Sequence, residues 1–262
     1  MPDRYKNQTM LTLGTDAIHI HLLRPEPVKD IGNTSLDGAE RQRAQAFKFD
    51  KDRDLYVAAH VFLRQVLSRY ASVPQKNWRF VNNAYGKPAV ANPGYRWLQF
   101  NLSHTPGRVA CAVARNRALG VDVEQHKCLS DLPSLCRHTF SPIEAEDVLS
   151  AAPPCNRKQR FFSYWTLKEA YIKARGMGLS LPLQQFSFVP DTELNWRLHY
   201  APGFFDDGKS WQCNSARLEE SHYLGYCVQS DGDASQRRLM VQVMETDASG
   251  NFYNLETLFC FP

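Results

Sequence analysis

Hydrophobic and polar residues alternate close to the N-terminus. Ile18, Ile20 and Leu22 occupy every second position. His19 and His21 fill the positions between them. Because successive side chains of a strand point to opposite faces, this period of two predicts a β-strand. We expect its apolar face to be buried and its two histidines to face solvent.

A helical pattern replaces this alternation further along the chain. Asp37 and Glu40 have the spacing of a capping box, with a carboxylate in place of the usual hydroxyl. Apolar residues then recur at helical intervals as far as Val66, and the basic residues among them are typical of a solvated helix face. We therefore expect a long helical region that begins near Asp37.

Two more helices are predicted in the second half. Ser141, Pro142 and Glu144 are typical of a helix start, with an N-cap, a first-position proline and a closing glutamate. Another helix is expected over about residues 157–175, and Gly176 follows it as C-terminal glycines do.

Extended segments account for most of the remainder. The turn signal at residues 85–88 separates two of them. Strands are expected at residues 78–81, 97–102, 109–113, 120–124, 186–188, 196–200, 211–218, 223–228 and 239–244. The mixture predicts an α+β protein with an N-terminal lobe (1–115) and a C-terminal lobe (116–262). A ligand site is expected between the lobes, where such sites are common.

Composition narrows the class of protein. The chain has 262 residues, of which 43% are hydrophobic and 12% aromatic, enough for a core and unlike a disordered chain. The net charge of +4 is too small to indicate nucleic-acid binding, but it suits an acidic partner. No apolar leader and no run of about 20 apolar residues is visible, so we expect a cytoplasmic protein with no membrane partner.

The cysteines favour reduced thiols. There are seven, without a CxxC pair, as in many cytosolic proteins. One alternative is a zinc site formed by His126, Cys128, Cys136 and His138. Its H-x-C and C-x-H spacings differ from the usual C-x(2–4)-C knuckle, so a connecting segment with buried thiols is favoured.

Two carboxylates are expected to project together from one strand. Asp122 and Glu124 are two positions apart in the run GVDVE, so they share a face. Like charges at this spacing repel each other unless a cation lies between them. A hard divalent ion such as Mg²⁺, which takes oxygen ligands, would suit this pair. By themselves, the two acidic residues of a D-x-E pair are more often solvent-facing residues of a strand.

A second charged group lies on the helix over residues 157–175. Glu169 and Lys173 are four residues apart, so they share a helix face and could be an ordinary surface ion pair. In the functional interpretation, Glu169 completes a three-carboxylate metal site while Lys168 and Lys173 meet phosphate. A pyrophosphate carries more negative charge than one Mg²⁺ cancels, so it needs such lysines.

Ser103 and His104 form a third candidate. Adjacent strand residues face opposite ways, so they cannot form a catalytic dyad with each other. A G-x-S-x-G elbow and a G-x-x-x-x-G-K-[ST] loop are both missing from the sequence, which argues against an α/β-hydrolase and a P-loop nucleotide site. Phosphate binding by this pair is better supported.

Together these motifs resemble a known family. The runs from Gly120 to Glu124 and from Trp165 to Lys173 are similar to the paired signature of the 4′-phosphopantetheinyl transferase superfamily. Other matching segments, in the family's order, are 85–88, 101–104, 140–144 and 178–182. The matches cover roughly residues 40–190. The length is similar to that of the larger surfactin-synthetase type, which implies a monomeric pseudodimer of two similar α+β lobes with the active site between them.

The resemblance implies roles for individual residues. Asp122, Glu124 and Glu169 would hold Mg²⁺, or Mn²⁺, against the pyrophosphate of coenzyme A. Lys168 and Lys173 would contact phosphate oxygens, with Lys168 and Glu169 as catalytic residues. Ser103, His104 and Lys87 would bind the 3′-phosphoadenosine end. The basic residues that hold the 3′-phosphate match only loosely, to Arg41, Arg43 or Arg53.

The implied reaction transfers the 4′-phosphopantetheine arm of coenzyme A to a serine of an apo acyl, peptidyl or aryl carrier protein and releases 3′,5′-ADP. Glu169 is the candidate for taking the serine proton, directly or through a metal-bound water. Two alternatives remain open. One is a different Mg²⁺-dependent phosphoryl or nucleotidyl transferase, and the other is a non-catalytic module that binds coenzyme A or a carrier protein.

Overall fold

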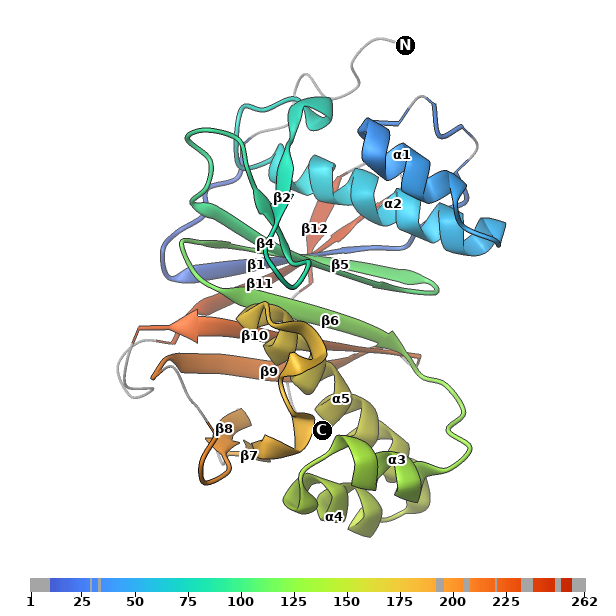
Figure 1. Ribbon diagram of the computed structural model, residues 1–262, viewed down its shortest axis with the longest axis vertical. Coiled ribbons are helices and arrows are strands. Elements are labelled where there is room, and N and C mark those ends of the chain that lie inside the picture. Colours follow the sequence, from blue (N-terminus) through green and yellow to red (C-terminus); the bar gives the residue numbers. More distant parts are fainter. Residues whose placement is uncertain are drawn as a thin grey trace.

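The computed structural model describes residues 10–28, 30–32, 34–191, 196–204, 208–219, 221–231, 238–247 and 251–255. Within these residues the chain forms an α+β fold with two five-stranded sheets, as predicted for the class (Figure 1). The first sheet has the order β12 (Phe252–Asn254), β11 (Met240–Thr246), β1 (Ala17–Leu23), β5 (Arg108–Arg115), β4 (Leu98–Thr105). The second has the order β6 (Leu119–Gln125), β10 (His222–Ser230), β9 (Ser210–Leu218), β8 (Trp196–Tyr200), β7 (Phe186–Pro190).

Helices cover the outer face of each sheet, so the molecule has four layers (Figure 1). The helices are α1 (Gly38–Gln45), α2 (Asp50–Leu67), α3 (Leu132–Thr139), α4 (Pro142–Ser150) and α5 (Pro154–Arg175). A small hairpin of β2 (Phe80–Asn82) and β3 (Pro88–Val90) lies between α2 and β4 in the sequence. In the described part of the chain, none of the helices combines the length and apolarity that a membrane span requires.

The predicted long helical region is divided into two helices. α1 begins at the predicted capping box, in which Asp37 accepts a hydrogen bond from Glu40 N and the Glu40 carboxylate accepts one from Asp37 N. α2 begins after Phe49, whose extended backbone ends the continuity. α2 then packs its apolar face, including Phe62 and Val66, against the first sheet.

The C-terminal strands return to the N-terminal sheet. β11 pairs in parallel with β1, and β12 pairs with β11, whereas the prediction places both segments in the C-terminal lobe. The chain passes from one sheet to the other between β5 and β6. Strands that are far apart in the sequence can pair in one sheet. A boundary drawn at a single position of the chain therefore cannot assign β11 and β12 to the sheet that they join.

The prediction that His19 and His21 face solvent is wrong. His19 is 6% exposed and His21 is 0% exposed. His19 Nδ1 lies 2.8 Å from the hydroxyl of Tyr70, and His21 Nε2 lies 2.6 Å from the same oxygen. β1 is an inner strand, with the second sheet over its apolar face and the end of the α2 region over the other, so neither face reaches water.

Side chains join the two sheets at β4 and β6. Three side chains of β4 accept hydrogen bonds from backbone N–H groups of β6. The pairs are Asn101 with Val121 (2.9 Å), Ser103 with Val123 (3.3 Å) and Thr105 with Gln125 (3.3 Å). Because these β4 residues alternate, one face of the strand is committed to β6, which aligns the two strands side by side.

Two glycines allow α5 to approach the second sheet. A Cβ on Gly120 would lie 1.9 Å from the carbonyl oxygen of Ala170, and one on Gly225 would lie 2.5 Å from that of Thr166. Any larger residue at Gly120 would therefore collide with the helix backbone. α5 ends at Gly176, which has a left-handed backbone (φ 64°), as the sequence predicts.

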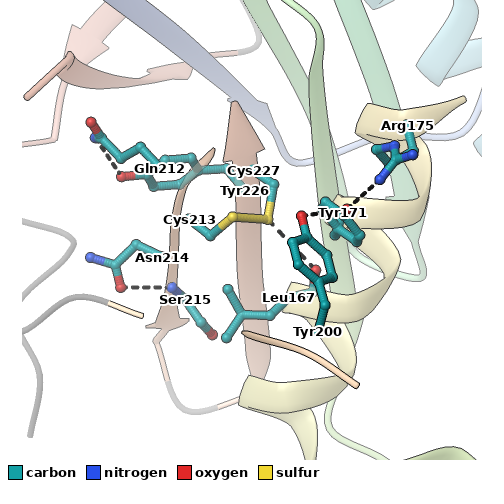
Figure 2. The surroundings of a disulfide bond; sticks show 10 residues. All are labelled: Leu167, Tyr171, Arg175, Tyr200, Gln212, Cys213, Asn214, Ser215, Tyr226 and Cys227. Carbon is teal, nitrogen blue, oxygen red and sulfur yellow. Dashed lines mark hydrogen bonds between the residues drawn. A yellow bond between two sulfur atoms is a disulfide. The ribbon is translucent and has the colours of Figure 1, made fainter. Parts of the chain in front are cut away.

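The second sheet contains a disulfide, contrary to the prediction of reduced thiols. Cys213 and Cys227 are directly opposite each other on β9 and β10, with Cα atoms 4.2 Å apart, and their sulfur atoms are bonded (Figure 2). Cys227 Sγ also lies against the carbonyl of Leu167 in α5 (Figure 2). Sequence spacing alone does not reveal that two cysteines occupy one cross-strand pair.

The four residues of the zinc alternative lie in different surroundings. The ring of His126 packs on Phe162, and Cys128 is exposed. Cys136 is buried in the core of the C-terminal half, while His138 Nδ1 donates to the carbonyl of its helix neighbour Ser134.

Candidate active site

Asp122 and Glu124 point from β6 toward α5, as their spacing predicts. Asp122 is 3% exposed, and its Oδ1 accepts a hydrogen bond of 2.6 Å from Lys173 Nζ. Glu124 Oε1 accepts one of 3.1 Å from Trp165 Nε1. Lys173 and Trp165 lie on the same side of α5. The carboxylates of β6 therefore face hydrogen-bond donors of this helix.

Ser103 brings the first sheet into this cluster. Its hydroxyl donates to Asp122 Oδ1 at 2.9 Å and accepts from Lys173 Nζ at 2.9 Å. Ser103, Asp122 and Lys173 thus form a closed triangle of hydrogen bonds built from β4, β6 and α5. The candidate site therefore contains residues of both sheets.

His104 points away from Ser103, as expected for neighbours in a strand. Its side chain is exposed, while Ser103 is buried. The pKa of His104 is lowered, first by the loss of hydration among surrounding protein atoms and then by the nearby charges of His60 and Lys173. His104 therefore lies within electrostatic range of Lys173, but it makes no contact with the triangle.

The carboxylates act on one another electrostatically. Burial raises the pKa of Glu124, and the charge of Asp122 raises it further. Burial also raises the pKa of Glu169, followed by the charge of Asp122, whereas Lys173 opposes the shift. Burial is the first cause of both shifts, and the negative charge of Asp122 adds to each of them.

The donor set fits a hard divalent cation. Asp122 Oδ2 is buried without a hydrogen-bond partner among the described residues, and an orphaned carboxylate oxygen of this kind is a natural metal ligand. In the same part of the chain, no three His, Cys, Asp or Glu side chains already converge as ligands. Oxygen ligands suit Mg²⁺ and Mn²⁺ alike.

Trp165 is a site residue that the sequence reasoning missed. The sequence places it only in the run from Trp165 to Lys173, yet its indole N–H donates a hydrogen bond to Glu124 Oε1. The available signal was its position four residues before Glu169, which places both on one side of the helix.

Lys168, which the resemblance assigns to phosphate contact, points into the protein core instead. Its side chain is 0% exposed, and Nζ lies 2.8 Å from Glu144 Oε2. It also donates to the carbonyls of Leu183 (2.6 Å) and Phe186 (2.7 Å), so all three ammonium hydrogens have acceptors. Adjacent helix residues point about 100° apart, which sends Lys168 into the core while Glu169 faces β6.

Lys87 links two elements of the site rather than projecting from it. Nζ donates to the carbonyl oxygens of Leu119 (2.9 Å) and Ala174 (3.1 Å), and burial lowers its pKa to about 8. Asn83 of the same turn donates to Gly176 O at 2.7 Å. This turn therefore ties the end of α5 to the start of β6.

The N-terminal arginines are not brought to the carboxylates. Arg53 pairs with Asp50 (2.7 Å) and Asp54 (2.9 Å) inside α2. Arg43 is exposed on α1, and Arg41 is half-buried on the same helix. Within the described residues, none of the three hydrogen-bonds to the Ser103, Asp122 and Lys173 triangle.

Comparisons with known proteins agree with these motifs. Residues 118–227 match the model described as "4′-phosphopantetheinyl transferase superfamily", and residues 31–116 match "4′-phosphopantetheinyl transferase, N-terminal". The chain is 37% identical over 175 residues to 4′-phosphopantetheinyl transferase HetI of Nostoc sp., covering 65% of this chain and 73% of that protein. It is 31% identical over 215 residues to a phosphopantetheinyl transferase of Thraustochytrium sp., covering 77% and 74%.

Two further similarities are weaker. The 4′-phosphopantetheinyl transferase Sfp of Bacillus subtilis is 32% identical over 148 residues, covering 56% of this chain and 63% of that protein. Among solved structures, an ACPS–CoA complex from Chronobacterium ammoniagenes aligns with 45% of this chain and 98% of its own, at a TM-score of 0.35 and 15% identity. A likeness of this size does not define the fold.

Proposed function

Because this chain belongs to the 4′-phosphopantetheinyl transferase superfamily, we propose that Ser103, Asp122, Glu124, Glu169 and Lys173 form its active site. The enzyme transfers the 4′-phosphopantetheine arm of coenzyme A to a serine of an apo carrier protein, which leaves 3′,5′-ADP. The observation that carries the site assignment is the orphaned Oδ2 of Asp122, a residue whose charge raises the pKa of both Glu124 and Glu169.

Asp122, Glu124 and Glu169 are the residues that would hold Mg²⁺. When bound, the ion would offset the charge of the pyrophosphate and polarise its oxygens. Two observations support this choice. The carboxylates repel one another without a cation, and the donors are all oxygen.

Lys173 is the cation that this chain places next to the carboxylates. Its ammonium has three hydrogens, of which two are used by Asp122 and Ser103, so one remains for a phosphate oxygen. Ser103 holds Lys173 and Asp122 in place through its hydroxyl. His104, exposed nearby, is assigned to the 3′-phosphoadenosine end of coenzyme A.

Glu169 is assigned as the base. The carrier serine hydroxyl attacks the β-phosphorus of coenzyme A, its proton passes to the Glu169 carboxylate, and the bond to the departing 3′,5′-ADP breaks. A carboxylate of raised pKa accepts a proton more readily than an ordinary one, which supports this role.

The two sheets are proposed to be the two lobes of a pseudodimer, with the active site where β4 meets β6. Ser103 comes from one sheet and Asp122 from the other. A monomeric enzyme is part of this proposal. A cytoplasmic location is part of the same proposal.

The test mixes the purified protein with Mg²⁺, coenzyme A and several apo carrier proteins, which are then weighed intact by mass spectrometry. We expect a gain equal to one phosphopantetheine, which EDTA abolishes and excess Mg²⁺ restores. Reaction with ATP and without coenzyme A would indicate a nucleotidyl or phosphoryl transferase instead. Binding of coenzyme A without any transfer would indicate a binding module.

A further inference from the structure

A cavity lies just past the end of β6 that carries Glu124. It has a volume of about 430 Å³ and is lined by His126, Pro154, Lys158, Gln159, Arg217 and Tyr223. His126 follows Glu124 by two residues and continues the strand pairing, since its N–H donates to Ser221 O at 2.7 Å. At the rise of a strand, the backbone of His126, which lines the cavity, lies about 7 Å from that of Glu124.

The floor of this cavity is aromatic and firmly packed. Tyr223 is 3% exposed and stacks on Phe162 with ring centroids 5.5 Å apart. The His126 ring meets Phe162 edge-on at 5.4 Å. A floor of this kind is rigid, so side chains at the rim have a defined surface to lie on.

The rim of the cavity is basic. Lys158 comes from the first turns of α5, and Arg217 comes from the end of β9. Both side chains line the same cavity as His126, so the two cationic groups lie around one hollow. Lys158 makes no ion pair or hydrogen bond within the described part of the chain, so its ammonium is available to an anion.

We propose that this basic pocket receives an acidic side chain of the carrier protein, close to the serine that is modified. The proposal rests on the proposed function. The carrier serine must reach Glu169, so the carrier surface around that serine must cover the neighbouring enzyme surface. Carboxylates there would meet Lys158 and Arg217 over an apolar floor, which favours pairing because the floor displaces water.

Coenzyme A is the other anionic substrate, but its position argues against this pocket. Lys173 and Ser103, the residues assigned to its phosphates, contact Asp122, which comes before Glu124 in β6. The pocket lies at His126, on the other side of Glu124 along the strand. Glu124 and its partner Trp165 therefore come between the pocket and Asp122. The two substrates would then approach the carboxylates from opposite ends.

The experiment compares Lys158→Glu and Arg217→Glu with the wild-type enzyme, and uses Lys76→Glu as the matched control. Lys76 is exposed in the short helical turn Gln75–Asn77 of the N-terminal half. Lys76→Glu therefore changes the net charge by the same amount as the pocket variants, but at a position outside the pocket lining. We expect each pocket variant to raise the KM for an apo acyl or peptidyl carrier about tenfold, as loss of one favourable charge pair does. The KM for coenzyme A should stay within twofold, and the control should match the wild type.

A binding measurement separates this proposal from the proposed function. Titration calorimetry with a carrier whose target serine is replaced by alanine reports docking without transfer, and the pocket variants should weaken it tenfold. Replacing an acidic carrier residue near the serine with lysine should restore binding to Lys158→Glu. Unchanged carrier binding in both variants would overturn the pocket assignment, as would a rise in the KM for coenzyme A instead. Docking of this carrier by the wild-type enzyme, together with no transfer to the serine-containing carrier, would contradict the proposed function alone.

Discussion

Lys168 Nζ lies 2.8 Å from Glu144 Oε2, and neither side chain is exposed to solvent. Glu144 also accepts hydrogen bonds from Ser141 N at the start of α4 and from Phe188 N in β7, both within 2.9 Å. The ion pair therefore joins α4, α5 and β7 one residue away from Glu169. We therefore expect Lys168 to act as a positioning residue for this turn of α5.

Lys168→Met should destabilise the fold by about 3–5 kcal/mol, because it leaves the buried Glu144 carboxylate without its counter-ion. Urea unfolding followed by circular dichroism measures this loss. The double variant Lys168→Met with Glu144→Gln should recover much of it, since no buried charge then remains. A Lys168→Met protein of wild-type stability that transfers nothing would return Lys168 to the phosphate-binding residues.

Glu169→Gln should lower the rate of transfer at least about 100-fold, the usual contribution of a general base. The pKa of Glu169 is raised in the fold, so its protonated form is favoured there. That contribution to stability is complete below pH about 4.5 and is lost as the pH rises through the raised pKa. At pH 7.5 without divalent ions, the glutamine variant should therefore melt above the wild type.

Added Mg²⁺ provides the control for this variant. It should raise the melting temperature of the wild type, because a ligand that binds only the folded state stabilises it. The rise should be much smaller for Glu169→Gln. Equal rises in both proteins would remove Glu169 from the metal-binding residues.

Gly120→Ala should cost stability and activity together. The new methyl group would lie 1.9 Å from Ala170 O and 2.5 Å from Ala174 N, so α5 must move away from β6. Overpacking of this kind costs about 1–3 kcal/mol or more, and a shift of about 1 Å between Lys173 and Asp122 could lower the rate 100-fold. Thermal melting and the transfer assay measure the two effects.

Gly38→Ala is the matched control, since a Cβ there meets nothing within 4 Å. Gly38 opens α1, where alanine is compatible with the helix, so stability should be unchanged or slightly higher. Normal activity in Gly120→Ala would mean that the helix and strand are not held together at this point.

The stability of the protein should fall as the pH drops below 6.5. Burial lowers the pKa of His21 well below its usual value, so the unfolded chain takes up a proton before the folded protein does. Between pH 7.5 and 5.5 this difference amounts to about 1 kcal/mol for His21. Urea unfolding at the two pH values measures it, and His21→Gln should reduce the pH dependence. A pH dependence that is the same in His21→Gln and in the wild type would contradict the assignment.

Several features of the site follow from residues close together in the sequence. The period of two places Asp122 and Glu124 on one side of β6, and helical spacing places Glu169 with Lys173. The position of Lys168 did not follow, because the family motif includes it beside Glu169 while the helix turns it into the core. Glu144 and the backbone carbonyls of Leu183 and Phe186, which accept from its ammonium group, explain how a lysine can be buried there.

The sequence by itself determined the local elements: the capping boxes at Asp37 and Ser141, the helix stop at Gly176, and the carboxylate pair of β6. These depend on backbone and side-chain contacts within a few residues. The tertiary structure alone decided that β11 joins β1, that His21 is buried, and that Ser103 meets Asp122. Each of these depends on which surfaces pack together across distant parts of the chain, and such packing leaves no local signal in the sequence.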